Sequence, residues 1–183
     1  MGAISRMNMM LSKDATVQES GFTNLLSISM GVDVFTADWL YCDRISSYVA
    51  RMVSHNRTDS LLYSNLLSSA LNELLETAFR CNGGVGSMTC RILRRGARDR
   101  IELEIPADDA VLAFFAETAA ALARSDAADQ YRAALFADGP VDPRMGLLEL
   151  SVDYGADIEI APIGSSAVLL AADFNLEPEA AHA

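Results

Sequence analysis

Residues 59–80 read DSLLYSNLLSSALNELLETAFR, a leucine-rich stretch with a helical period. At about 100° per residue its apolar side chains fall on one face and its polar side chains on the other. The apolar face comprises Leu67, Leu71, Leu74, Leu75 and Ala78, and the polar face comprises Asn65, Ser69, Asn72, Glu73, Glu76, Thr77 and Arg80. The NGG at 82–84 supplies residues that tolerate positive φ and end a helix. The stretch therefore predicts a helix over about 59–81 with a polar stripe.

The segments on either side of this helix alternate between strand and helix patterns. The expected strands are 22–30, 88–95, 100–105, DIEIAP from 157 and SAVLLAADF from 166, with hairpin turns through Gly96 and Gly164. The expected helices run from a cap at Thr36 to about 53, over 107–138 with a break near Ser125, and over 145–155 with closure at Gly155. Because long crossovers for parallel strands are missing, this order predicts an α+β two-layer sandwich.

Length and composition predict one domain. At 183 residues the chain is long enough for a single buried core, and its 51% hydrophobic content is far above that of disordered chains. Residues 1–20 are polar and Met-rich without a stable period, so a loosely ordered arm is expected there. We expect the domain over 21–176 and a disordered tail over 177–183.

The charge balance argues against nucleic acid as a partner. The formal net charge is −11, whereas phosphate backbones need clustered Lys and Arg. The densest basic stretch, RILRRGARDR at 91–100, is expected to project its charges at the exposed end of a hairpin; a docking site for an acidic partner is the alternative.

Several other site types lack support in the sequence. Cys42, Cys81 and Cys90 are an odd number without metal-ligand spacing, so neither a disulfide framework nor a zinc site is expected. The two histidines, His55 and His182, give no basis for a catalytic triad or a histidine metal site. No signal peptide or membrane-spanning run is recognisable, and a cytoplasmic protein is expected.

NELLETA at 72–78, the hairpin that follows it, and MGLLELSVDYGADIEI at 145–160 resemble the GHKL (Bergerat-fold) ATPase superfamily. The nearest group is the stand-alone bacterial regulators related to anti-sigma-factor serine kinases and histidine-kinase ATPase domains. The resemblance runs from about Phe35 to Leu176. It implies a sandwich of Bergerat type, with a mixed sheet and helices on one face.

The resemblance also assigns roles to particular residues. Family members bind ATP between this helix and a Gly-rich lid, with an acid as base and an Asn on magnesium; Glu73 matches the acid and Thr77 the Asn. Positions i and i+4 lie on one helix face, so the two side chains can act together. Asp108 lies near the position of the adenine-reading Asp, and Arg144 and Gly146 lie in the lid.

The sequence departs from the family pattern at three of these sites: the magnesium ligand, the adenine-reading Asp and the Gly-rich lid. The Thr77 hydroxyl is a shorter, neutral replacement for an amide ligand of magnesium. PADDA after the second hairpin strand puts Ala107 at the adenine position, with Asp108 one register away and no glycines following. In the lid only Gly146 is left, and Arg144 stands where another glycine is expected.

Three hypotheses follow. The first is a bacterial signalling regulator with a degenerate GHKL fold that binds no cofactor and acts through protein contacts. Its partner would be a response regulator, a sensor kinase, a sigma-factor antagonist or a second copy in a homodimer. The second is an active serine protein kinase of the anti-sigma type that uses ATP and magnesium, with Glu73 as base. The third is a small-molecule sensor with an apolar cavity.

Overall fold

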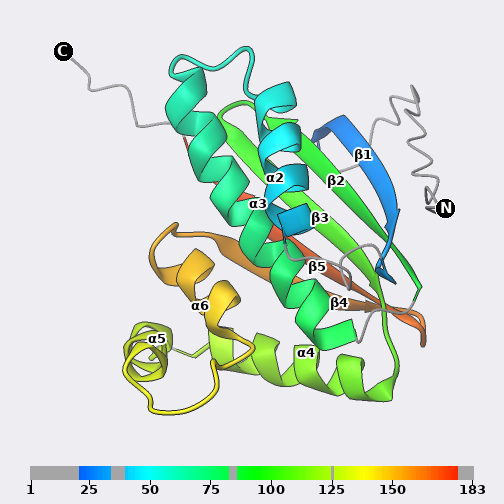
Figure 1. The fold of residues 1–183 in the computed structure, drawn as a ribbon, viewed down its shortest axis with the longest axis vertical. Helices are drawn as coiled ribbons and strands as arrows, with labels where there is room; N and C mark the ends of the chain where they lie inside the picture. Colours follow the sequence, from blue (N-terminus) through cyan, green and yellow to red (C-terminus); the bar gives the residue numbers. More distant parts are fainter. Residues whose placement is uncertain (1–20, 34–39, 83–85, 125, 177–183) are drawn as a thin grey trace, which may run out of the picture.

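The computed structural model describes residues 21–33, 40–82, 86–124 and 126–176, which form a layer of helices on one face of a sheet (Figure 1). The expected arm over 1–20 and tail over 177–183 lie outside the described residues. So do the cap at Thr36, the glycines at 83–84 and the break at Ser125.

The sheet has the order β1-β2-β3-β5-β4. Its strands are β1 Thr23–Gly31, β2 Ser87–Arg95, β3 Arg98–Pro106, β4 Asp157–Ile163 and β5 Ala167–Phe174. All four strand pairings are antiparallel, so the expectation of a mixed sheet is wrong for the described residues. Short hairpin turns explain two of these pairings, β2 with β3 and β4 with β5. The other two follow helical connections: α2 and α3 bring β2 beside β1, and β5 returns beside β3 and leaves β4 at the edge.

The helices cover one face of this sheet (Figure 1). They are α2 Leu40–Val53, α3 Ser60–Asn82, α4 Asp109–Leu122, α5 Ala127–Leu135 and α6 Met145–Val152. The Asp59 carboxylate accepts a hydrogen bond of 3.0 Å from the Leu62 amide and caps the start of α3. The predicted α+β sandwich is confirmed.

The core lies between α3 and the sheet. The predicted apolar face of α3 is buried in full, and Leu67, Leu71 and Leu74 have no exposed surface. Against it pack alternate residues of the strands, including Ile92, Ile101, Leu103 and Leu170. A 3.6-residue period on the helix and a 2-residue period on the strands thus meet in one apolar layer.

The opposite face of the sheet carries paired charges instead of helices. Arg100 contacts Glu102 at 2.9 Å, Glu159 at 2.5 Å and Asp173 at 3.4 Å across three adjacent strands. Ion pairs of this kind contribute little to stability individually. They keep the sheet face polar where no helix of the described chain covers it.

The basic hairpin does not project all of its charges into solvent, which corrects the expectation for 91–100. Asp99 is fully buried, and its carboxylate contacts Arg57 at 2.5 Å and Arg94 at 2.7 Å. The Tyr63 hydroxyl donates a further hydrogen bond to Asp99. Arg94 also donates a hydrogen bond of 3.1 Å to the carbonyl oxygen of Val53, the last residue of α2.

This Asp99 cluster joins the helix layer to the sheet. The guanidinium carbon of Arg57 lies 4.8 Å from the centre of the Tyr63 ring, which adds a cation–π contact. Burial and the hydrogen bond to Asp99 raise the pKa of Tyr63 to about 12, so the phenol keeps its proton and remains a donor. Removing the carboxylate would leave two arginines enclosed by protein without their counter-ion.

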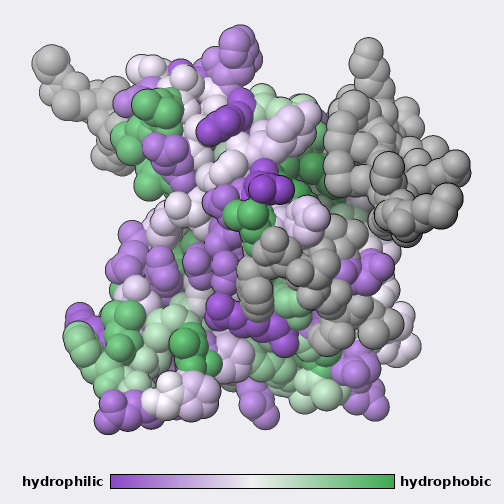
Figure 2. Space-filling model, in the orientation of Figure 1, coloured by the Kyte–Doolittle hydropathy of each residue, from purple (hydrophilic) through white to green (hydrophobic). Residues whose placement is uncertain are grey.

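Hydrophobic side chains also remain on the outer surface of the helix layer. In Figure 2 they gather over the N-terminal end of α3 and around α5 with the chain that follows it. Leu61 is 73% exposed and Phe136 is 85% exposed.

We expect Asp99→Ala to lower the free energy of unfolding by about 3–5 kcal/mol, because it leaves Arg57 and Arg94, whose side chains are only 6% and 17% exposed, without their counter-ion. Urea denaturation followed by circular dichroism measures the change. Asp157→Ala is the control, since that side chain is 79% exposed and pairs with Arg98 at the surface; its cost should stay below about 1 kcal/mol. Equal costs for the two variants would contradict a structural role for the cluster.

Candidate functional site

Helix α6 crosses α3 directly over the predicted polar stripe. Glu73 and Thr77 lie one turn apart on α3, and Gly146, the second residue of α6, packs between them. Thr77 is only 2% exposed, although the helical pattern placed it on the polar face. The structure therefore brings three of the five predicted site residues together.

Gly146 lets the backbone of α6 approach α3 closely. A Cβ atom built at this position would lie 2.7 Å from Glu73 Oε2, 3.1 Å from Thr77 Oγ1 and 3.4 Å from the Glu73 carbonyl oxygen. Any side chain must displace the Glu73 carboxyl group, so the backbone of α6 rests on α3 itself. The space beside Glu73 and Thr77, where the resemblance places phosphates and magnesium, is occupied by protein.

The Glu73 carboxyl group lies in an environment that disfavours its charge. Partial burial raises its pKa, and the neighbouring carboxylates of Glu149 and Glu76 raise it further. Burial and Asp153 likewise raise the pKa of Glu149 on α6. Tyr131 of α5 donates a hydrogen bond of 2.9 Å to Asp153, which fixes α5 beside the end of α6.

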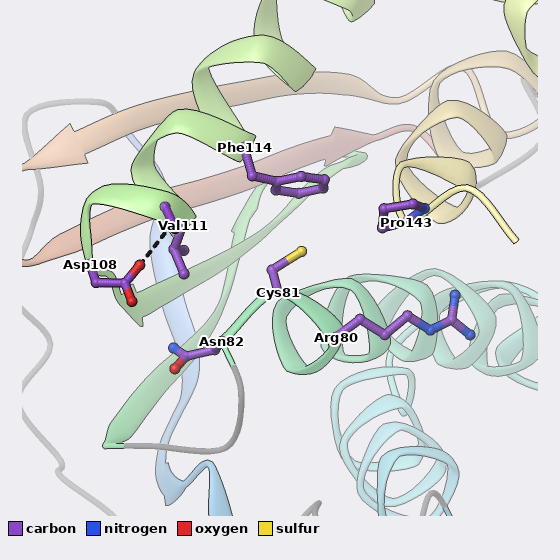
Figure 3. A pocket seen from close by; sticks show the side chains of 8 residues that line it. Arg80, Cys81, Asn82, Asp108, Val111, Phe114 and Pro143 are labelled. Carbon is purple, nitrogen blue, oxygen red and sulfur yellow. Dashed lines mark hydrogen bonds between the residues drawn. The ribbon is translucent and has the colours of Figure 1, made fainter. Parts of the chain in front are cut away.

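Asp108 lies away from this contact, at the start of α4. Its carboxylate accepts a hydrogen bond of 2.9 Å from the Val111 amide, so it serves as the N-cap of the helix. It borders a cavity of about 320 Å³ between the last turn of α3 and the first turns of α4, where Cys81 and Asn82 face Val111 and Phe114 (Figure 3).

Arg144 borders a different cavity, of about 610 Å³, between α4, α5 and the loop that leads into α6. Its guanidinium forms two hydrogen bonds to the Asp142 carboxylate, at 3.1 and 2.7 Å. Phe114 and Pro143, which point toward one another in Figure 3, line both cavities, so the cavity beside Asp108 and the cavity beside Arg144 are neighbours.

The sequence did not single out the two residues that both cavities share. Phe114 has a helical spacing with Phe115, Leu122, Tyr131 and Leu135, a pattern more typical of a core than of an interface. Phe115 and Tyr131 are buried, whereas Leu135 is 52% exposed. Pro143 carried no signal beyond that of a loop residue. The spacing of charged residues alone could not show that an aromatic ring and a proline would line both cavities.

The described residues offer little conventional catalytic chemistry at these cavities. No group of three or more His, Cys, Asp or Glu side chains among them is arranged to hold a metal ion. Burial raises the pKa of the Cys81 thiol to about 11, so this thiol is not activated as a nucleophile. Glu73 beside the Thr77 hydroxyl is the one predicted catalytic pair that the structure places in contact range of a common neighbour, Gly146.

Comparison with known proteins shows a similarity in fold. No family model and no curated protein matches the chain. A chain in the crystal structure of the SiaB–SiaC complex from Pseudomonas aeruginosa has the same fold, with a TM-score of 0.57 and 13% sequence identity. The match covers 82% of this chain and 89% of that chain. Among the described residues no helix has the length and apolarity of a membrane span.

A double-mutant cycle tests the contact of Gly146 with α3. Gly146→Ala forces the Glu73 carboxyl group aside. We expect this substitution to lower the free energy of unfolding of the wild-type protein by about 0.5–1 kcal/mol more than it lowers that of the Glu73→Ala variant. The free energies of unfolding of the four proteins measure this coupling. Additive effects would show that α6 does not rest on Glu73.

The raised pKa of Glu73 predicts a particular pH dependence. The folded protein binds more protons than the unfolded chain between the ordinary value of 4.5 and the raised value, so stability falls as pH rises through this window. Glu73→Gln removes the penalty and should stabilise the protein at pH 7 by up to about 1 kcal/mol.

Thermal unfolding of Glu73→Gln between pH 4 and 8 measures this effect. Glu76→Gln is the comparison on the same helix face, because it relieves only part of the repulsion on Glu73 and loses the ion pair of 2.9 Å with Arg80. A loss of stability in Glu73→Gln at pH 7 would show that the ionised carboxylate has a favourable partner.

Proposed function

We propose that this protein is a bacterial signalling regulator with a degenerate GHKL-type fold, which acts in the cytoplasm by binding another protein and not by turning over ATP. The contact between Gly146 and the Glu73–Thr77 pair carries the proposal. It fills the space in which the family holds magnesium and phosphate, and it does so with backbone that has no rotamer to move away.

The separation of the other two predicted residues supports the same proposal. Asp108 is engaged as a helix cap, and Arg144 is engaged by Asp142 in another cavity. A nucleotide bound as in the family needs all five positions to converge on one ligand. The fold likeness to a chain of a two-protein complex is in keeping with a protein partner, such as a response regulator, a sensor kinase or a sigma-factor antagonist.

The alternative is an active serine protein kinase that uses ATP and magnesium. One observation favours it: the pKa of Glu73 is raised, as a general base working near neutral pH requires. In this alternative α6 must move off α3 to admit the phosphates, with Thr77 in the metal shell, Asp108 on adenine, and Arg144 and Gly146 on the phosphates.

Calorimetric titration with ATP, with and without magnesium, separates the two. We expect no heat of binding and no thermal shift in protein that circular dichroism shows to be folded. Thr77→Asn, which restores the family's amide ligand, should not restore binding, because the added atoms meet α6. Magnesium-dependent binding in the micromolar range that Glu73→Ala abolishes would reject the regulator proposal and establish the kinase.

A further inference from the structure

The cavity of about 610 Å³ between α4, α5 and the loop before α6 is an open groove lined by apolar side chains together with Glu117, Asp142 and Arg144. Phe114 of α4 faces Ala134 of α5, and Pro140, Val141 and Pro143 of the loop form the other wall. Alanines and prolines lose little side-chain entropy when a ligand covers them, and they leave room for a large side chain of that ligand.

The apolar surface continues beyond the groove. Val141 is 66% exposed on its wall, and Leu135 and Phe136 are 52% and 85% exposed at the end of α5. Figure 2 shows this hydrophobic surface around α5 and the loop that follows it. A patch that extends past a cavity is larger than a small ligand can cover, and contiguous exposed apolar surface of this kind marks protein contact sites.

Negatively charged side chains outnumber positively charged ones around the groove. Its two positive side chains are already engaged, Arg144 with Asp142 at 2.7 Å and Arg132 with Asp129 at 2.8 Å. Glu117 in the lining shares Arg144 with Asp142, since its charge also raises the pKa of that guanidinium, and Asp138 lies just beyond the end of α5. Four carboxylates, Glu117, Asp129, Asp138 and Asp142, thus stand against two guanidinium groups at the groove and its rim.

We propose that this α4–α5 groove binds an amphipathic segment of a partner protein, in which a large apolar side chain lies beside Lys or Arg. The apolar side chain would fill the space between Phe114 and Val141, and the cation would pair with Glu117 or Asp138. The inference rests on the proposed function and adds to it the surface and the chemistry of the partner.

The groove is also joined to the Glu73 site through its own wall. The loop from Pro140 to Arg144 leads without interruption into α6, whose second residue, Gly146, rests on Glu73 and Thr77. A segment packed against Val141 would hold this loop, and with it α6, in the position that fills the space beside Thr77.

Synthetic peptides provide the test on the full-length protein. The probe is a fluorescent peptide of leucine and lysine, about 14 residues long so that it spans roughly four helical turns. A leucine–glutamate peptide of the same pattern controls for charge. We expect the lysine peptide to bind at least about tenfold more tightly in fluorescence anisotropy, and to protect backbone amides of 134–144 from hydrogen exchange.

Variants at exposed positions locate the binding. Phe136→Ser and Val141→Ser should each weaken the lysine peptide by about fivefold to tenfold, and Glu117→Lys should weaken it and strengthen the glutamate peptide. Leu61→Ser is the matched control, because Leu61 is as exposed as Val141 but lies at the start of α3; it should change nothing.

Three outcomes would overturn the inference: no binding, equal binding of the two peptides, or binding of the lysine peptide that none of the groove variants alters. Self-association abolished by Phe136→Ser would also overturn it and assign the groove to a second copy. The ATP titration judges the proposed function separately. Magnesium-dependent ATP binding rejects that function whatever the peptides do, and failure of the peptides alone rejects only the groove.

Discussion

The buried carboxylate of Asp99 sets the position of the helix layer on the sheet. A charge enclosed by protein needs opposite charges and donors around it, and here they come from three places in the chain: Arg57, Tyr63 and Arg94. Arg94 in turn donates to the carbonyl oxygen of Val53 and so ties the end of α2 to the same cluster. These contacts fix the first turn of α3 above β2 and β3. Since α3 then runs over the sheet as the support for α6, the geometry at Glu73 depends on this cluster at the other end of the helix.

The sequence contained the elements and their order, because apolar spacing with a period of 3.6 or 2 is a local property. It also contained the register that turns Arg94 and Asp99 toward the helix layer. Arg94 shares its face of β2 with Cys90 and Ile92, and Asp99 shares its face of β3 with Ile101; Asp99 is fully buried and the Arg94 side chain is 17% exposed. The charges of these side chains suggested an exposed end, and the partners that make their burial possible, Arg57 and Tyr63, lie more than 30 residues away in sequence.

The candidate site likewise has features that could be predicted from the sequence and features that could not. The i, i+4 spacing correctly placed Glu73 and Thr77 side by side, and Asp108 before a helical segment carried an N-cap signal that could have been weighed against its role on adenine. The close approach of Gly146 could not be predicted, because it depends on how α6 packs across α3. A glycine in a lid permits phosphate binding, and the same glycine permits one helix to rest on another; only the tertiary contact distinguishes the two.

That contact changes what Glu73 can do. A carboxyl group with a raised pKa, close to a hydroxyl, is suited to remove a proton, but only if a substrate can reach it. Here the space is taken by the α6 backbone, and the group instead becomes part of a helix–helix interface crowded with Glu149 and Glu76. The crowded carboxyl groups lie beside an apolar contact in which Leu147 and Leu150 of α6 are fully buried, and two flanking contacts also hold α6 in place. These are the Tyr131–Asp153 hydrogen bond on one side and the loop from Pro140 to Arg144 on the other. A partner that binds this loop therefore acts on the segment that positions α6 over Glu73 and Thr77.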